Sequence, residues 1–207
     1  MKSLLLGLVL LAGCSLGGNK SPAPAIYDFG LKSLPSSVQV APHLNASILM
    51  TEITAPVWLA TPAIQYRLAY HDAARSYHYA QSRWVTSPAK LLSRRIQDDL
   101  VQSTRKGVVS SHEGLKSDYA LHLELEEFTQ VFDQPHSSRA VIRLRANLVE
   151  RATRQLIAQH KFSVEQATTS ADAAGAVAAL IQLSDQLSTE IIRWLADQLT
   201  EPAGKSL

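Results

Sequence analysis

Three segments in the second half of the chain alternate apolar and polar residues, and this pattern restricts the fold more than any other feature of the sequence. They are residues 119–125, 140–148 and 156–164, in which nearly every second side chain is apolar or small. Successive side chains of a strand point to opposite faces of its sheet, so a period of two indicates strands with one buried face. Three such segments in succession predict an antiparallel meander.

Charges on these segments predict the register of the first hairpin, with its turn centred on Gln134 and Pro135. The expected cross-strand pairs are Leu125 with Leu144 on the buried side, and Glu124 with Arg145 and Glu126 with Arg143 on the exposed side. Each opposite-charge pair contributes about 0.2 to 1 kcal/mol. The alternation breaks at residues 127–128, where we expect a bulge or the end of the strand.

Two segments have helical periodicity. In residues 89–103 an apolar side chain recurs at every fourth position, after Ser87 as a predicted N-cap and Pro88 in the first turn. We expect Arg94, Arg95, Asp98 and Asp99 to lie outside the apolar stripe of this helix. Residues 170–199 carry a longer stripe and many alanines, which favour helix.

Shorter strands are expected at residues 46–53, 63–70 and 76–79, with a turn at 71–74 between the last two, and Val108 and Val109 form another candidate. Two helices on one face of a largely antiparallel sheet define the fold class α+β, a two-layer sandwich.

The N-terminus has the anatomy of a secretory signal. Lys2 precedes an apolar run from Leu4 to Leu11, and the sole cysteine, Cys14, directly follows Leu11-Ala12-Gly13. The tetrad Leu-Ala-Gly-Cys resembles the bacterial lipobox, in which the cysteine thiol is lipidated and cleavage occurs before it. The alternative is an ordinary signal peptide with a chance cysteine. Ser15 stands where the inner-membrane retention signal of many Gram-negative lipoproteins has Asp, so this resemblance indicates the outer membrane.

These features predict three parts of the chain. Residues 1–13 are the cleaved signal peptide, residues 14–25 are the lipidated end and a tether rich in small residues and proline, and residues 26–207 form one domain. Several acyl chains hold a protein stably at a membrane. The mature protein is therefore expected to be a folded body anchored to the periplasmic face of the outer membrane.

Composition excludes several classes of function. The net charge of +2 and the absence of a large Lys/Arg cluster predict no nucleic-acid partner. With Cys14 lipidated, no thiol remains for a disulfide, a nucleophile or a zinc ligand. The seven histidines share no metal-ligand spacing, and neither a metal nor another cofactor is expected. His122 is predicted on the outer face of its strand, and His160 on the inner face as a hydrogen-bonded structural residue.

Glu124, Glu126 and Glu127 could be paired catalytic acids, but an exposed strand face opposite arginines accounts for them without catalysis. Arg94, Arg95, Arg105 and Lys106 are either a solvated helix face or a patch for phospholipid headgroups.

Aromatic residues concentrate between positions 58 and 84. Trp58, Tyr66 and Trp84 are our candidates for a partner-docking surface, because aromatic side chains bury large areas at low entropic cost. The equally weighted alternative places them at a corner of the core.

The chain resembles the ABC-type transport auxiliary lipoprotein family over nearly its whole mature length, and the likeness rests on the order and spacing of several segments. These are Ile26-Tyr27-Asp28-Phe29-Gly30, then Pro56-Val57-Trp58-Leu59-Ala60-Thr61-Pro62-Ala63-Ile64-Gln65-Tyr66-Arg67, then Tyr79-Ala80-Gln81-Ser82-Arg83-Trp84, and then Leu91-Leu92-Ser93-Arg94-Arg95-Ile96-Gln97-Asp98-Asp99-Leu100 after Pro88. Thr61-Pro62 and the residues between Trp84 and Pro88 depart from the family pattern.

The resemblance implies a non-enzymatic lipoprotein that docks an MCE-type (mammalian cell entry) transport system at the outer membrane. Its implied partners are an MCE-domain protein and the associated ABC permease and ATPase, which move phospholipids or other hydrophobic molecules between membranes. A homo-oligomer is compatible with this role. Only Cys14 transfers as a functional position. The alternatives are a carrier that holds lipid in an enclosed apolar cavity, and a cell-envelope enzyme.

Overall fold

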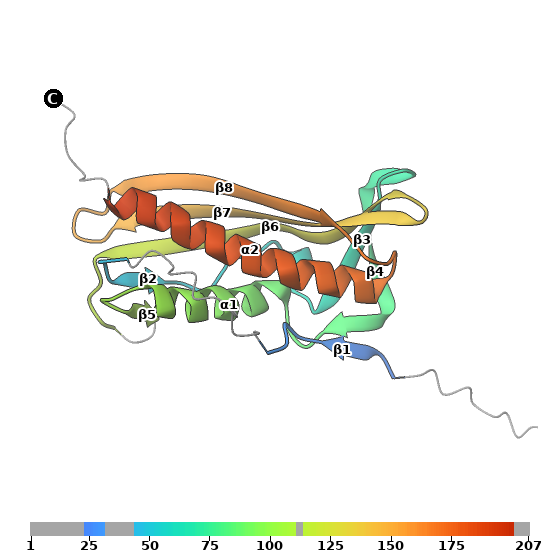
Figure 1. Cartoon of the computed structure of the whole chain (residues 1–207), viewed down its shortest axis with the longest axis horizontal. Coiled ribbons are helices and arrows are strands. Elements are labelled where there is room, and N and C mark those ends of the chain that lie inside the picture. Colours follow the sequence, from blue (N-terminus) through green and yellow to red (C-terminus); the bar gives the residue numbers. More distant parts are fainter. Residues whose placement is uncertain (1–22, 32–43, 111–113, 201–207) are drawn as a thin grey trace, which may run out of the picture.

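The structure, a computed structural model, describes residues 23–31, 44–110 and 114–200. A twisted eight-stranded sheet forms one layer, and two helices lie across one of its faces (Figure 1). The strands are β1 (Ala25–Tyr27), β2 (Ile48–Met50), β3 (Ala63–Leu68), β4 (Asp72–Trp84), β5 (Val108–Ser110), β6 (Tyr119–Gln134), β7 (Ser137–Glu150) and β8 (Leu156–Ala167); the helices are η1 (Val57–Leu59, a 3₁₀ turn), α1 (Pro88–Ser103) and α2 (Ala173–Thr200). The predicted α+β class is confirmed.

The long strand β6 organises the sheet. One edge of β6 pairs with β7 along almost its full length, and β7 pairs with β8, which confirms the predicted meander. The other edge of β6 is shared: its first residues pair with β2, and residues near its end pair with β3. The sheet therefore forks, with β2 and β5 on one branch and β3, β4 and β1 on the other.

The observed register of β6 and β7 confirms part of the prediction. Leu125 pairs with Leu144 and Glu124 with Arg145, as expected. A bulge between Leu125 and Glu127 then shifts the ladder by one residue, so that Glu127 rather than Glu126 lies opposite Arg143. The predicted pair of Glu126 with Arg143 is wrong, because the bulge begins one residue earlier than expected.

Two of the four polar residues that we expected outside the α1 stripe are buried. Arg95 and Asp99 are each 8% exposed, whereas Arg94 and Asp98 are exposed. The reason is α2, which packs against α1 and supplies partners: Nη1 of Arg95 lies 3.2 Å from Oδ1 of Asp185, and Ser188 Oγ donates to Oδ2 of Asp99 at 2.6 Å.

The layer between the sheet and the helices is filled by side chains. Inward-facing residues of β6 and β7 pack with one stripe from each helix in a single cluster. The largest of its almost fully buried side chains are Trp84, Phe128, Ile48, Ile64, Leu92, Ile96, Leu100, Leu121, Leu123, Leu125, Ile142 and Leu144. Burial of such side chains contributes about 1.5 to 3 kcal/mol each, so this layer is the main source of stability.

Several strand predictions need correction. The segment expected at residues 76–79 belongs to the much longer β4, and the turn before it lies at residues 69–71. On β8, only Phe162 and Val164 are buried among the five residues expected to share an inner face. His160 is exposed, although its ring contacts Phe162 and Trp194, because β8 is the edge strand and the helix layer covers its first half incompletely.

The predicted signal peptide, Cys14 and Ser15 lie outside the described residues. No helix within the described ranges is both long and apolar enough to cross a membrane.

Candidate functional site

The β3–β4 branch carries an aromatic cluster beyond the N-terminal end of α2. The Tyr66 ring stacks on Tyr77 with centroids 5.3 Å apart, and it lies 4.8 Å from Tyr79 and 5.8 Å from Phe132. The guanidinium of Arg75 sits over the Tyr77 ring at 4.8 Å. The three tyrosines are partly exposed, whereas Phe132 is buried. We call Tyr66, Tyr77, Tyr79, Phe132 and Arg75 the aromatic platform.

A chain of hydrogen bonds holds the platform against the sheet. Tyr79 Oη donates to Gln130 Oε1 at 2.6 Å, and Gln130 Nε2 donates to Ser138 Oγ at 2.8 Å. Ser138 Oγ in turn lies 2.7 Å from Oγ1 of Thr168, after β8. Burial, followed by the nearby charge of Asp172, raises the pKa of Tyr79 to about 12. Tyr79 is therefore a permanent donor near neutral pH, and its ring is fixed in place.

The three residues predicted for docking occupy three different environments. Trp84 is 1% exposed and packs edge-on against Phe29 and Phe128, with centroids 5.7 and 5.8 Å apart. The interpretation of Trp84 as a surface residue is therefore wrong, because the end of β4 turns this ring into the core. Tyr66 belongs to the aromatic platform, and Trp58 on η1 is 57% exposed.

The Trp58 carbonyl oxygen and the Tyr66 side chain also lie on opposite faces of β3. The carbonyl oxygen of Trp58 accepts a hydrogen bond from the side chain of Gln65. Gln65 alternates with the buried Ile64 and with Tyr66, so its side chain points to the face away from the helices. A single flat surface therefore does not contain the predicted triad.

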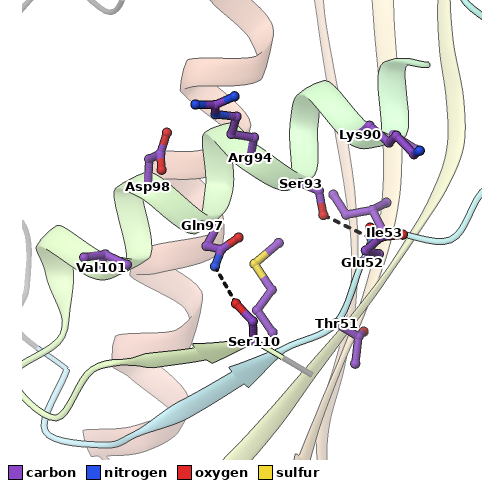
Figure 2. A pocket seen from close by; sticks show the side chains of 12 residues that line it. Thr51, Glu52, Ile53, Lys90, Ser93, Arg94, Gln97, Asp98, Val101 and Ser110 are labelled. Carbon is purple, nitrogen blue, oxygen red and sulfur yellow. Dashed lines mark hydrogen bonds between the residues drawn. The ribbon is translucent and has the colours of Figure 1, made fainter. Parts of the chain in front are cut away.

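An open cleft of about 490 Å³ separates the outer side of α1 from β5 and the segment after β2 (Figure 2). α1 contributes Lys90, Arg94 and Asp98 to its lining, and the segment after β2 contributes Glu52 and the apolar Ile53. Gln97 Nε2 donates to Ser110 Oγ at 3.0 Å across one end of it. Equal numbers of charges of each sign give the cleft no preference for an anionic headgroup.

The basic residues of the sequence are dispersed in the structure. Arg95 is buried between the helices, and Arg94 lies in the cleft on α1. Lys106 lies elsewhere and forms an ion pair with Asp118 at 3.6 Å. The four cations therefore do not form one phospholipid patch, and Arg94 and Arg105 are the exposed members outside this ion pair.

The glutamates of β6 are paired with basic side chains. Glu127 lies 2.9 Å from Arg143 and 3.7 Å from Arg67, and Glu126 lies 3.6 Å from Lys161. Glu124 contacts Arg145 directly. The described ranges contain no group of three His, Cys, Asp or Glu residues that could hold a metal ion.

Electrostatic contacts also fix the loops that border the sheet. Asp118 accepts a backbone hydrogen bond from Ser47, which, with Lys106, holds the pKa of its carboxyl below the ordinary range. Asp172 caps α2 by accepting from the Gly175 backbone N–H at 2.8 Å, and that bond lowers its pKa. Sequence reasoning missed this cap because it placed the start of the helix at Ser170.

Solved structures share this fold. A Xanthomonas campestris protein described as a member of the family DUF330 is 21% identical, with a TM-score of 0.72 over 84% of this chain and 96% of that one. A second, uncharacterised protein is 18% identical, with a TM-score of 0.61 over 84% of this chain and 99% of the other. A hypothetical protein of Chlamydia trachomatis is 10% identical, with a TM-score of 0.51 over 75% and 98%.

Comparison with curated proteins finds no match. The model of the ABC-type transport auxiliary lipoprotein component family matches residues 29–192, which include almost all of the folded body. Such a component is held at a membrane of the cell envelope through its lipid and assists an ABC transport system. On this match, the chain belongs to the ABC-type transport auxiliary lipoprotein component family.

Proposed function

We propose that this protein is lipidated at Cys14 and docks an MCE-type ABC transport system at the periplasmic face of the outer membrane, without enzymatic activity of its own. The observation that carries the proposal is the family match over residues 29–192. The Leu-Ala-Gly-Cys tetrad and Ser15 support the anchor and the choice of membrane. The cargo of the system would be phospholipids or other hydrophobic molecules.

The filled interior supports a docking role over a carrier role. A carrier needs an enclosed apolar cavity for its lipid. Here the space between the sheet and the helices is occupied by fully buried side chains, and the cleft on α1 is open and lined by both charged and apolar residues. The glutamates that could serve as paired acids are engaged in ion pairs, which supports a non-enzymatic role.

The aromatic platform is the proposed surface for the transporter partner. Its stacked rings and the Arg75–Tyr77 contact combine apolar area with one cation, a composition typical of interface hot spots. The hydrogen-bond chain from Tyr79 to Thr168 fixes the Tyr79 ring before binding, and the Tyr66 ring packs between Tyr79 and Tyr77, so little side-chain entropy remains to be lost.

Affinity capture of the full-length protein from membranes, followed by mass spectrometry, tests the proposal. We expect an ATPase, a permease and an MCE-domain protein to be recovered with it. Substitution Tyr77→Ala should reduce recovery at least about tenfold, since a hot-spot truncation costs about 2 kcal/mol or more. Substitution Arg94→Ala is the control, because Arg94 is exposed in the cleft on α1 and away from the platform.

Three outcomes would contradict the proposal in different ways. Recovery of no transporter component would refute the docking role. Stoichiometric phospholipid in the purified protein, without partners, would favour the carrier. Equal recovery with Tyr77→Ala and Arg94→Ala would keep the role but place the docking surface elsewhere.

A further inference from the structure

Exposed apolar side chains gather where the chain enters the folded body. Ile26 is 56% exposed, Val85 59%, Val57 84% and Trp58 57%. Monomeric soluble proteins leave single hydrophobic residues exposed without consequence, but a group of large ones marks an interaction surface. We call these four residues the tether-end patch.

Backbone contacts join the three segments that carry these residues. Ile26 on β1 lies opposite Arg83 on β4, and the Val85 N–H donates to the Tyr27 carbonyl at 2.7 Å. The loop after η1 returns to the same place, since the Trp84 N–H donates to Pro62 O at 2.8 Å. Ile26 and Arg83 are exposed while their neighbours Tyr27 and Trp84 face the core. Ile26 and Arg83 thus lie on the outer face of the sheet, away from the helices, and the Trp58 carbonyl oxygen, which accepts from Gln65, borders the same face.

The position of this patch along the chain limits what can cover it. Ten residues lie between Cys14 and Ala25, the first residue of β1, and the eleven residue-to-residue steps span at most about 36 Å. A membrane anchor at Cys14 therefore keeps the patch near the bilayer at all times. At such proximity a weak apolar contact is sufficient for lasting association.

We propose that the tether-end patch rests on the lipid surface to which Cys14 is anchored, an inference that rests on the lipidation in the proposed function. Trp58 suits the boundary between headgroups and acyl chains, where tryptophan is enriched. The exposed guanidinium of Arg83, between β1 and β3, is placed to meet lipid phosphates. The aromatic platform lies on the other face of β3, so it remains available to a protein partner.

Three exposed valines provide a matched experiment. Val57 and Val85 belong to the patch, and Val101 is 53% exposed on the last turns of α1. Fifteen residues lie between Val85 and Val101, most of them helical with a rise of about 1.5 Å each, so Val101 lies about 20 Å away along α1. Each valine is replaced by cysteine in the full-length lipidated protein: Val57→Cys, Val85→Cys and Val101→Cys. Acylation blocks the thiol of Cys14, so a nitroxide label attaches only at the new cysteine.

The labelled proteins are reconstituted in vesicles of phosphatidylethanolamine and phosphatidylglycerol, and the label is probed by paramagnetic resonance with oxygen and with a water-soluble nickel chelate. We expect the labels at positions 57 and 85 to be relaxed mainly by oxygen, which concentrates in lipid. The label at position 101 should be relaxed mainly by the nickel chelate. Far-ultraviolet circular dichroism checks that the three variants fold alike.

Labels at 57 and 85 that respond to nickel as strongly as the label at 101 would overturn the inference. Protection from both reagents would also overturn it, because it would show protein rather than lipid over the patch. A thiol assay separates these results from failure of the proposed function: one thiol per chain means that Cys14 is modified, whereas two would refute the anchor and this inference together.

Discussion

Arg95 on α1 contacts both the segment after β1 and α2, and its replacement tests whether these contacts hold the N-terminal end of the folded body in place. Nη2 of Arg95 donates to the carbonyl oxygen of Phe29 at 2.8 Å, and its guanidinium lies 5.8 Å from the centre of the Phe29 ring. Its other nitrogen, Nη1, pairs with Asp185 on α2. The substitution Arg95→Met keeps the apolar stem and removes these polar contacts.

The expected loss of stability follows from the burial of each partner. A hydrogen bond from a charged donor contributes about 1.5 to 3 kcal/mol. Phe29 is 7% exposed, so water can hardly replace Arg95 as the hydrogen-bond donor to its carbonyl oxygen. Asp185 is 41% exposed, and its ion pair adds less than about 1 kcal/mol. We expect a total of roughly 2 to 3 kcal/mol. For a domain of this size the melting temperature should fall by about 4 to 12 °C.

The measurement is thermal unfolding of the full-length protein in detergent, with Arg94→Met as the control on the exposed side of α1. The control should change stability by less than about 0.5 kcal/mol. Hydrogen exchange adds a local test: the Val85 N–H, bonded to Tyr27, should exchange faster, and the Trp84 N–H, bonded to Pro62, should not. Equal melting temperatures for the two variants, with unchanged exchange at Val85, would refute the reasoning.

Two further predictions concern stability. Trp84→Ala should lower the free energy of unfolding, measured in urea, by about 3 to 5 kcal/mol, because Trp84 is buried. Trp58→Ala should lower it by less than about 1 kcal/mol, because Trp58 is 57% exposed. Similar urea midpoints for the two variants would contradict the assignment of Trp84 to the core. Asp172→Ala should remove an α2 cap contributing about 1 kcal/mol. The pKa of Asp172 is lowered in the folded state, so this stabilisation is complete above about pH 4 and is lost as the pH falls further; a difference that widens in acid would be inconsistent with it.

Local patterns in the sequence were sufficient to predict the central elements. The period of two identified the β6–β8 meander, and the charges of Glu124 and Arg145 identified its register up to the bulge. Helical spacing placed α1 within one residue of its observed start. These predictions succeed because each depends on neighbours within a few residues or across one short turn, where side-chain direction follows directly from backbone period.

The fork of the sheet was not predictable in this way. Each parallel ladder joins only three residue pairs from distant parts of the chain, such as Ile26 with Arg83 on β1 and β4. Segments this short lack a periodic signal of their own, and the edge of β6 that they share is specified by packing rather than by turns.

The sequence alone therefore determined the α+β class, the meander and the helices, together with the candidate anchor at Cys14. Tertiary structure decided which polar and aromatic residues became buried: Arg95 because α2 supplied Asp185, and Trp84 because Phe29 and Phe128 enclosed it. The physical reason is that burial depends on contacts between residues far apart in the chain. Such contacts cannot be predicted from a residue type and its immediate neighbours in the sequence.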